Sequence, residues 1–218
     1  MSGINACVTV RGWGLVIETA GTSLQLGLLK DGEPHSGIRW DGKNQHGEKL
    51  IPFAMQLLHE NHLQWGDIRY AVYHQGPGSH TGLRIGLSAV KAWALSLKWD
   101  VYAVPLMRVL YEVARQRGIA EKVFTFWEAR KGQWYGQLWE AEKASAPPTL
   151  LPSATWIHCA REYLWVGNAF EAHFYIHEIS WLMVAAAARH LTPICRMEEL
   201  ITLTPLYFRE FIPTQRRK

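Results

Sequence analysis

The stretch GPGSHTGLRIGL, from Gly76 to Leu87, decides the fold, because its glycine-rich turn joins a predicted strand to a predicted helix. The apolar run at residues 70–74 before it is typical of a buried strand. Ser79 or Thr81 can cap the helix, since a hydroxyl oxygen accepts a hydrogen bond from the free N–H groups of a first helical turn. The helix itself is predicted over residues 81–97.

Two interpretations of this turn stay open on the residues alone. Free N–H groups at a helix start favour an anion, and Arg84 in the first turn can assist, which indicates a phosphate site. The stretch has neither the Gly-Lys-Ser/Thr of a Walker A loop nor the spacing GxGxxG. The more ordinary interpretation is a structural turn that leads into a helix.

The predicted helix has two distinct faces. The first is a core stripe at spacings of three and four, formed by Leu83, Leu87, Val90, Ala94 and Leu97. The second face carries Gly82, Gly86, Ala89 and Trp93. Glycine within a helix costs about 1 kcal/mol relative to alanine. Two glycines one turn apart therefore indicate the close approach of another element, either of this chain or of a partner.

A first helix is predicted over His46–Glu60, and its apolar arc is unusually wide. The arc covers roughly 200° and contains Leu50, Ile51, Phe53, Ala54, Met55, Leu57 and Leu58. Packing on one sheet needs only about half of that arc. The helix therefore either lies between a sheet and another helix of the same chain or offers its second face to another subunit.

The remaining pattern is that of an α/β protein whose order partly restarts after Pro105. Strands are predicted at residues 13–18, 24–29, 34–40 and 101–104, with an Asp31-Gly32 hairpin turn. After Pro105 we predict a helix at 106–117, strands at 123–127 and 133–140, a loop at 144–153, a strand at 164–166, a helix at 179–190 and an extended piece at 203–207.

Composition excludes several classes of protein. The 218 residues are 48% hydrophobic and 19% charged, which is typical of a globular chain. Three of the positive charges behind the net charge of +4 are Arg216, Arg217 and Lys218, so the body is too neutral for a broad nucleic-acid face. The three cysteines form no CxxC pair, which favours free thiols in a reducing compartment. With no secretory signal and no apolar run of about 18 residues, we expect a cytoplasmic protein without membrane contact.

The run GPGSHTGLRIGLSAVKAWALSL resembles the signature of the TsaB (YeaZ) family, whose usual form is GPGSFTGLRIG, and His80 stands where the family has Phe. Other segments resemble the family in order and spacing. They are LVIETAGTSLQLGLLKDGE (15–33), HGEKLIPFAMQLL (46–58), EARKGQWYGQLW (128–139), WVGNAF (165–170) and PLYFRE (205–210). The resemblance covers nearly the whole chain from Trp13.

The resemblance implies an actin-like (ASKHA) fold with two related lobes, each a mixed sheet flanked by helices. It divides the chain into an N-terminal extension at 1–12, a first lobe at 13–105, a smaller second lobe at 106–212 and a basic tail at 213–218.

The function implied by the resemblance is that of a non-catalytic dimerisation subunit. Such a subunit supports a TsaD-type transferase, works with a TsaE-type ATPase, and serves the assembly that makes N6-threonylcarbamoyladenosine at position 37 of tRNAs reading codons that begin with A. We expect this subunit to hold no cofactor or metal of its own, because partners handle ATP and metal. It would meet tRNA indirectly and form a homodimer when alone. The alternative is an active actin-like kinase or ATPase acting on a small molecule.

Three sets of residues carry these expectations. The resemblance assigns the partner interface to the two helices of the first lobe, through Leu50, Phe53, Ala54, Leu57, Leu58, Gly82, Gly86, Ala89 and Trp93. The signature loop contains Gly76, Pro77, Gly78, Ser79, Thr81, Gly82 and Arg84. A vestigial nucleotide site would include Glu18, Thr22 and Glu128, where Glu18 and Glu128 replace aspartates of the family.

Other constellations give weaker signals. His59 and His62 in HENH lack the HExxH spacing that places two histidines on one face of a zinc-binding helix, so we predict no metal there. His80 beside Ser79 has no identifiable orienting acid, so a hydrolytic dyad is not indicated either. A peptidase therefore finds no support in the residues.

Overall fold

The computed structural model describes residues 11–42, 45–119 and 121–207. Of the predicted N-terminal extension, all but residues 11 and 12 lies outside the described residues. The basic tail at 213–218 and the last three residues of PLYFRE lie outside them as well.

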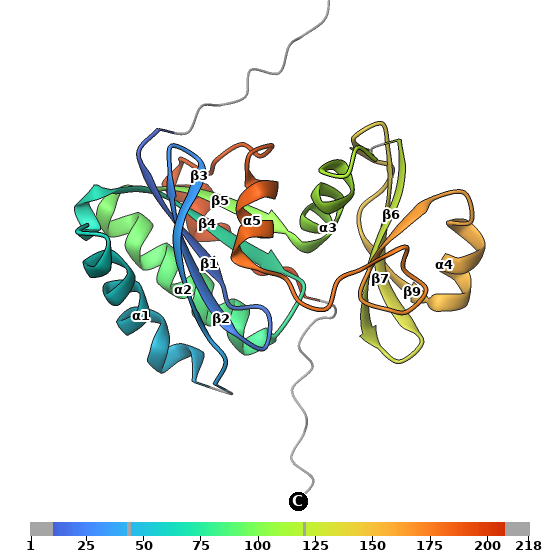
Figure 1. Ribbon diagram of the computed structural model, residues 1–218, viewed down its shortest axis with the longest axis horizontal. Helices are drawn as coiled ribbons and strands as arrows, with labels where there is room; N and C mark the ends of the chain where they lie inside the picture. The colour runs from blue at the N-terminus through green and yellow to red at the C-terminus, as the bar shows by residue number, and fades with distance from the viewer. Residues whose placement is uncertain (1–10, 43–44, 120, 208–218) are drawn as a thin grey trace, which may run out of the picture.

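The first sheet has the strand order β3-β2-β1-β4-β5 (Figure 1). Its strands are β1 (Trp13–Glu18), β2 (Leu24–Lys30), β3 (Glu33–Trp40), β4 (Ile68–Gly76) and β5 (Asp100–Pro105). The first three strands form an antiparallel meander, whereas β4 pairs in parallel with both β1 and β5. The sheet is therefore mixed, and its parallel part brings the carboxyl ends of β1 and β4 together.

Helices cover both faces of this sheet. One face packs against α1 (His46–Glu60) and α2 (His80–Leu97), and the other against α3 (Leu106–Arg115) and α5 (Trp181–Ala188) (Figure 1). Alternation along β1 explains this, because Leu15 and Ile17 join the core under α1 and α2 while Val16 joins the core on the opposite face. A short 3₁₀ turn, η1 (Trp65–Asp67), leads from α1 to β4.

The second sheet repeats the antiparallel hairpin with parallel strands beside it. Its order is β11-β10-β6-β7-β8, and β9 pairs with β7. The strands are β6 (Lys122–Arg130), β7 (Gln133–Glu140), β8 (Lys143–Ala144), β9 (Thr149–Pro152), β10 (Leu164–Gly167) and β11 (Phe174–Tyr175). One face carries a largely aromatic core with α4 (Ser153–Cys159), and α3 packs on the other. The predicted α/β class, with mixed sheets flanked by helices, is confirmed.

The end of the described chain returns to the first sheet. Helix α5 contacts β1, β2, β4 and β5, and the indole of Trp181 lies over Gly27 and Gly37, where side chains would collide with it. Ile194 then bridges to Val101, and α6 (Met197–Thr202) contacts α2. The chain from Trp181 onward thus packs on the first sheet rather than on the second.

Several predicted elements differ from those observed. Residues 144–153, predicted as a loop, include all of β9 and the start of α4, because β9 is a short edge strand that tolerates Pro152 at its end. The helices predicted at 106–117 and 179–190 are shorter, α6 was not predicted, and residues 203–207 form no strand. In the core stripe of α2, Leu97 is exposed because it lies at the last turn of the helix.

Candidate functional site

The signature loop joins β4 to α2 and is fixed to the turn after β1. Ser79, rather than Thr81, caps α2, since its Oγ accepts a hydrogen bond from the N–H of Gly82 at 3.2 Å. The N–H of Ser79 donates to the carbonyl of Ala20 at 2.8 Å. The loop therefore holds two strand ends together at one edge of the first sheet.

The two glycines of α2 face the chain's own β1. A Cβ at Gly82 would overlap the carbonyl oxygen of Thr19, and one at Gly86 would overlap the hydroxyl of Thr19. The close approach predicted from the glycine spacing is thus intrachain. It lets α2 lie directly on the end of β1.

The segment that contains Tyr207 covers the start of α2. The rings of His80 and Tyr207 stack at 4.3 Å with an interplanar angle of 5°, and Arg84 Nε donates to the Tyr207 hydroxyl at 3.0 Å. The N–H of Leu206 donates to the carbonyl of Gln75 at 2.8 Å. His80 therefore fills the aromatic position that Phe occupies in the family signature, and Arg84 contacts Tyr207 instead of lining the cleft described below.

A cleft of about 480 Å³ opens at the carboxyl ends of β1 and β4, between the two sheets. Apolar side chains of Pro77, Leu106, Trp127 and Ile179 form part of its lining. The polar side chains that line it are those of Glu18, Thr22, His74, Ser79, His177 and Glu178. No lysine or arginine of the described ranges lines this cleft.

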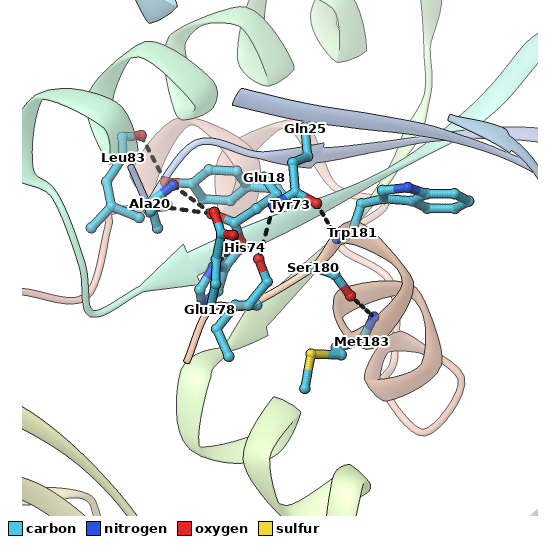
Figure 2. A network of polar contacts seen from close by, with 12 residues as sticks. Glu18, Ala20, Gln25, Tyr73, His74, Leu83, Glu178, Ser180, Trp181 and Met183 are labelled. Atoms are coloured by element: carbon cyan, nitrogen blue, oxygen red, sulfur yellow. Dashed lines mark hydrogen bonds and ion pairs between the residues drawn. The ribbon is translucent and has the colours of Figure 1, made fainter. Parts of the chain in front are cut away.

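Glu18 and His74 form a buried pair in this wall (Figure 2). The Oε1 of Glu18 accepts hydrogen bonds from the N–H groups of Ala20 at 2.7 Å and Gly21 at 3.1 Å, while its Oε2 contacts Nδ1 of His74. The two side chains are 1% and 2% exposed. Because a carboxylate only accepts hydrogen bonds, it holds a proton on Nδ1. Nε2 of His74 has no hydrogen-bond partner in the part of the chain that the structure describes.

A second polar group ties the segment before α5 to the first sheet. Glu178 accepts a hydrogen bond from Ser23 Oγ at 2.5 Å and forms an ion pair with Arg39 at 2.8 Å. The side chain of Arg39 donates hydrogen bonds to Asp41 and to Glu178, and these bonds, the one to Asp41 most strongly, raise the pKa of the guanidinium. Gln25 donates to the carbonyl of Ile179 at 3.1 Å. These contacts place Glu178 and Ile179 in the cleft.

A neighbouring cleft of about 550 Å³ lies at the start of α2. It is lined by Gly21, Thr22, His46, Ser79, Thr81, Gly82 and Ile85. Thr22 and Ser79 thus lie at both clefts.

The structure brings together only part of the predicted nucleotide set. Glu18 and Thr22 line the first cleft, whereas Glu128 is an exposed residue that does not line it. The Oε1 of Glu128 instead accepts from the N–H of Gly132 in its own hairpin at 3.3 Å. Sequence reasoning did not identify His74 and Glu178. A polar residue at the end of an apolar strand was the available signal for His74.

The predicted partner interface needs a correction. Six of its nine residues are buried within this chain: Leu50, Ala54, Leu57, Leu58, Gly82 and Gly86. The other three, Phe53, Ala89 and Trp93, are half-buried. The exposed large apolar side chains of these helices are Ile51 at 52%, Met55 at 55%, Leu95 at 40% and Leu97 at 38%. The wide arc of α1 therefore has an inner half that packs on the sheet and an outer half that faces solvent.

The described residues show neither a metal cluster nor a membrane-spanning helix. No group of three or more His, Cys, Asp or Glu side chains in those ranges could hold a metal ion. None of the helices in the described ranges is long and apolar enough to cross a membrane.

The family model and the two curated relatives described here are all named for the threonylcarbamoyl modification of tRNA. The family model "TsaD: tRNA N6-adenosine threonylcarbamoyltransferase" matches residues 41–146. The chain is 27% identical over 168 residues to the Bacillus subtilis tRNA threonylcarbamoyladenosine biosynthesis protein TsaB, a match that covers 73% of this chain and 72% of that protein. It is 25% identical over 140 residues to Escherichia coli TsaB, which covers 61% of this chain and 60% of that protein.

Solved structures share the fold. YeaZ from Pseudomonas aeruginosa superposes with a TM-score of 0.66 at 19% identity, covering 90% of this chain and all of that one. A protein from the same organism, described as similar to peptidase YeaZ, gives a TM-score of 0.68 at 20% identity and covers 91% of this chain and 100% of its own. The chain is thus similar in sequence to curated TsaB proteins and shares its fold with YeaZ from Pseudomonas aeruginosa.

Proposed function

We propose that this protein is a non-catalytic subunit in the biosynthesis of N6-threonylcarbamoyladenosine in tRNA, where it binds and supports a TsaD-type transferase. The observation that carries the proposal is the similarity to two curated relatives that both bear the name tRNA threonylcarbamoyladenosine biosynthesis protein TsaB. The modified nucleoside is that at position 37 of tRNAs that decode ANN codons.

The match to the TsaD family model supports the choice of partner. The matched residues, 41–146, contain α1, α2, β4 and β5 of the first sheet. A partner of that family would carry equivalent helices. Two related chains can pack equivalent surfaces against each other about a local twofold axis, as isologous dimers do. The same geometry would allow this protein to form a homodimer when the partner is absent.

The surface we assign to this contact is the outer side of α1 and α2. Ile51 and Met55 of α1 and Leu95 of α2 are exposed apolar side chains, and Phe53, Ala89 and Trp93 lie half-buried on the same helices. Contiguous exposed apolar surface is typical of a protein interface. This set keeps three of the nine residues expected from the sequence and leaves out the six that are buried.

The chemistry is assigned to the partners. The two carboxylates of the first cleft are engaged within the chain, since Glu18 is bonded to its own turn and to His74, and Glu178 to Ser23 and Arg39. No lysine or arginine of the described ranges lines that cleft to neutralise a triphosphate. In this proposal the transferase and a TsaE-type ATPase supply ATP and metal handling, and most of the tRNA contact is theirs.

Co-expression with a TsaD-type transferase tests the contact. We expect a complex on gel filtration with the native chain and its loss with Ile51→Asp combined with Met55→Asp. The control is Ile157→Asp on α4, which introduces one such charge at an apolar side chain that is 41% exposed. No complex with the native chain, or equal complex formation by all variants, would contradict the proposal.

The alternative, an active actin-like kinase or ATPase, is tested by isothermal titration of the isolated protein with ATP. The proposal predicts no binding heat. A saturable heat that is lost in Thr22→Ala would favour the alternative, because Thr22 lies at both clefts.

A further inference from the structure

Three N–H donors converge on one carboxylate at the end of β1. Two are the backbone N–H groups of Ala20 and Gly21, which donate to Oε1 of Glu18 at 2.7 and 3.1 Å, and the third is Nδ1 of His74, which contacts Oε2 (Figure 2). Successive backbone N–H groups in a tight turn form an anion-binding concavity. Here the anion in that concavity is a side chain of the same chain.

This arrangement lies in the wall of the 480 Å³ cleft rather than on the open surface. Glu18 is 1% exposed and His74 2% exposed, yet both line the cleft. Nε2 of His74 is buried in that wall without a hydrogen-bond partner among the described residues. His74 thus has one ring nitrogen in contact with Glu18 and a second that no described residue satisfies.

The other charges of the cleft do not favour a second anion. The second carboxylate of the lining, that of Glu178, carries negative charge, and no lysine or arginine of the described chain lines the cleft. The hairpin of the second sheet shows a comparable arrangement, since Glu128 Oε1 accepts from the N–H of Gly132 in its own turn. In each hairpin, therefore, a glutamate side chain accepts a hydrogen bond from backbone N–H groups of its own turn.

We propose that the turn at Ala20 and Gly21, together with His74, is an anion-binding site which the chain's own Glu18 carboxylate occupies. The occupied site excludes carboxylate and phosphate groups of free ligands from this end of the cleft. Vacating it by truncation of Glu18 would leave two N–H donors and an imidazole directed at a space of carboxylate size. This inference stands independently of the partner proposed above.

Chemical rescue of Glu18→Ala in the full-length chain is the test. Sodium formate and inorganic phosphate are the probes, against sodium chloride at equal ionic strength. We expect Glu18→Ala to unfold at a lower temperature than the native chain and to regain several degrees saturably with formate, because a ligand of the folded state alone raises the unfolding midpoint. Leu106→Ala is the control, since it truncates a buried side chain of the same cleft without removing a carboxylate, and formate should not rescue it.

A second measurement uses the native chain and does not depend on the variant's folding. The backbone amide resonances of Ala20 and Gly21 should stay unshifted during a phosphate titration of the native chain. A saturable shift there would overturn the proposal, because the site would then be open to a free anion. Equal effects of formate on Glu18→Ala and Leu106→Ala, or no effect of formate on Glu18→Ala, folded or not, would overturn it as well.

Discussion

The carboxylate of Glu18 contacts Nδ1 of His74 across two neighbouring parallel strands. The register of β1 and β4 pairs Ile17 with Tyr73. The next residues, Glu18 and His74, therefore lie side by side at the carboxyl ends of the two strands. Carboxyl ends of parallel strands are where α/β proteins place their ligand sites. In this chain the buried, hydrogen-bonded pair of Glu18 and His74 stands at that place and connects the first sheet to the cleft.

The first prediction concerns the strength of this pair. Removal of one partner of a buried hydrogen bond costs about 1–3 kcal/mol, because the remaining polar group is left buried without a partner. We expect Glu18→Gln and His74→Gln each to lower the free energy of unfolding, and the double variant to lose less than the sum of the two by at least about 1 kcal/mol. Urea unfolding of the native chain, the two single variants and the double variant measures these four free energies. Costs that add within about 0.5 kcal/mol would show that the two side chains act independently.

The second prediction concerns the packing of α2 on β1. Gly86→Ala should destabilise the fold by about 1–3 kcal/mol, because the new methyl group overlaps Thr19 and Tyr73 in a packed core. The control is Gly47→Ala in α1, whose Cβ would meet Ile85 Cδ1 at an ordinary 3.6 Å. Alanine favours a helix over glycine, so this control should be neutral or stabilising by up to about 1 kcal/mol. Equal unfolding midpoints for the two variants would contradict the position of α2.

The third prediction separates the inner and outer sides of α1. Leu57 is completely buried and Met55 is 55% exposed, although both belong to the same apolar arc. Leu57→Asp should unfold the protein, since an unpaired buried charge is among the costliest changes. Met55→Asp should change the free energy of unfolding by less than about 1 kcal/mol. Thermal unfolding followed by circular dichroism compares the two variants. Similar losses of stability for both would mean that α1 does not face the sheet with Leu57 and the solvent with Met55.

The fourth prediction is a pH dependence at His190. Burial lowers the pKa of His190 below its ordinary value of 6.5, and the charge of Glu112, whose Oε2 lies 3.6 Å from Nε2, opposes this shift. The unfolded chain therefore binds this proton at a higher pH than the folded chain. The contribution of His190 to the free energy of unfolding consequently falls as the pH drops through 6.5.

Replacement with glutamine tests this sign. We expect His190→Gln to lose less stability than the native chain between about pH 7.5 and about pH 5.5. Urea midpoints at the two values measure the difference. A larger loss of unfolding free energy on acidification in the variant than in the native chain would contradict the lowered pKa of His190.

Much of the first sheet and its helices could be predicted from local sequence. The bounds of α1 agree with the helical period of its apolar residues, and Ser79 caps α2 as one of the two hydroxyls offered by the sequence. These features depend on neighbouring residues, which is why periodicity and capping chemistry are sufficient to find them.

Features that depend on distant residues could not be predicted in this way. A helical wheel shows that α1 is apolar on both sides, but it does not show that Leu57 faces the sheet and Met55 faces solvent. The contact between Glu18 and His74 joins residues 56 positions apart. The return of α5 to the first sheet likewise depends on Trp181 fitting over Gly27 and Gly37, a match of shapes that only the folded chain brings together.

The central claim is a role in tRNA modification, and depletion of the protein from the cell that encodes it is the most direct test. Threonylcarbamoyladenosine in bulk tRNA would be measured by mass spectrometry of nucleosides, with the native chain and the Ile51→Asp, Met55→Asp double variant supplied in turn. We predict that depletion lowers the modified nucleoside several-fold, that the native chain restores it, and that the double variant does not. An unchanged level of threonylcarbamoyladenosine after depletion would contradict the account.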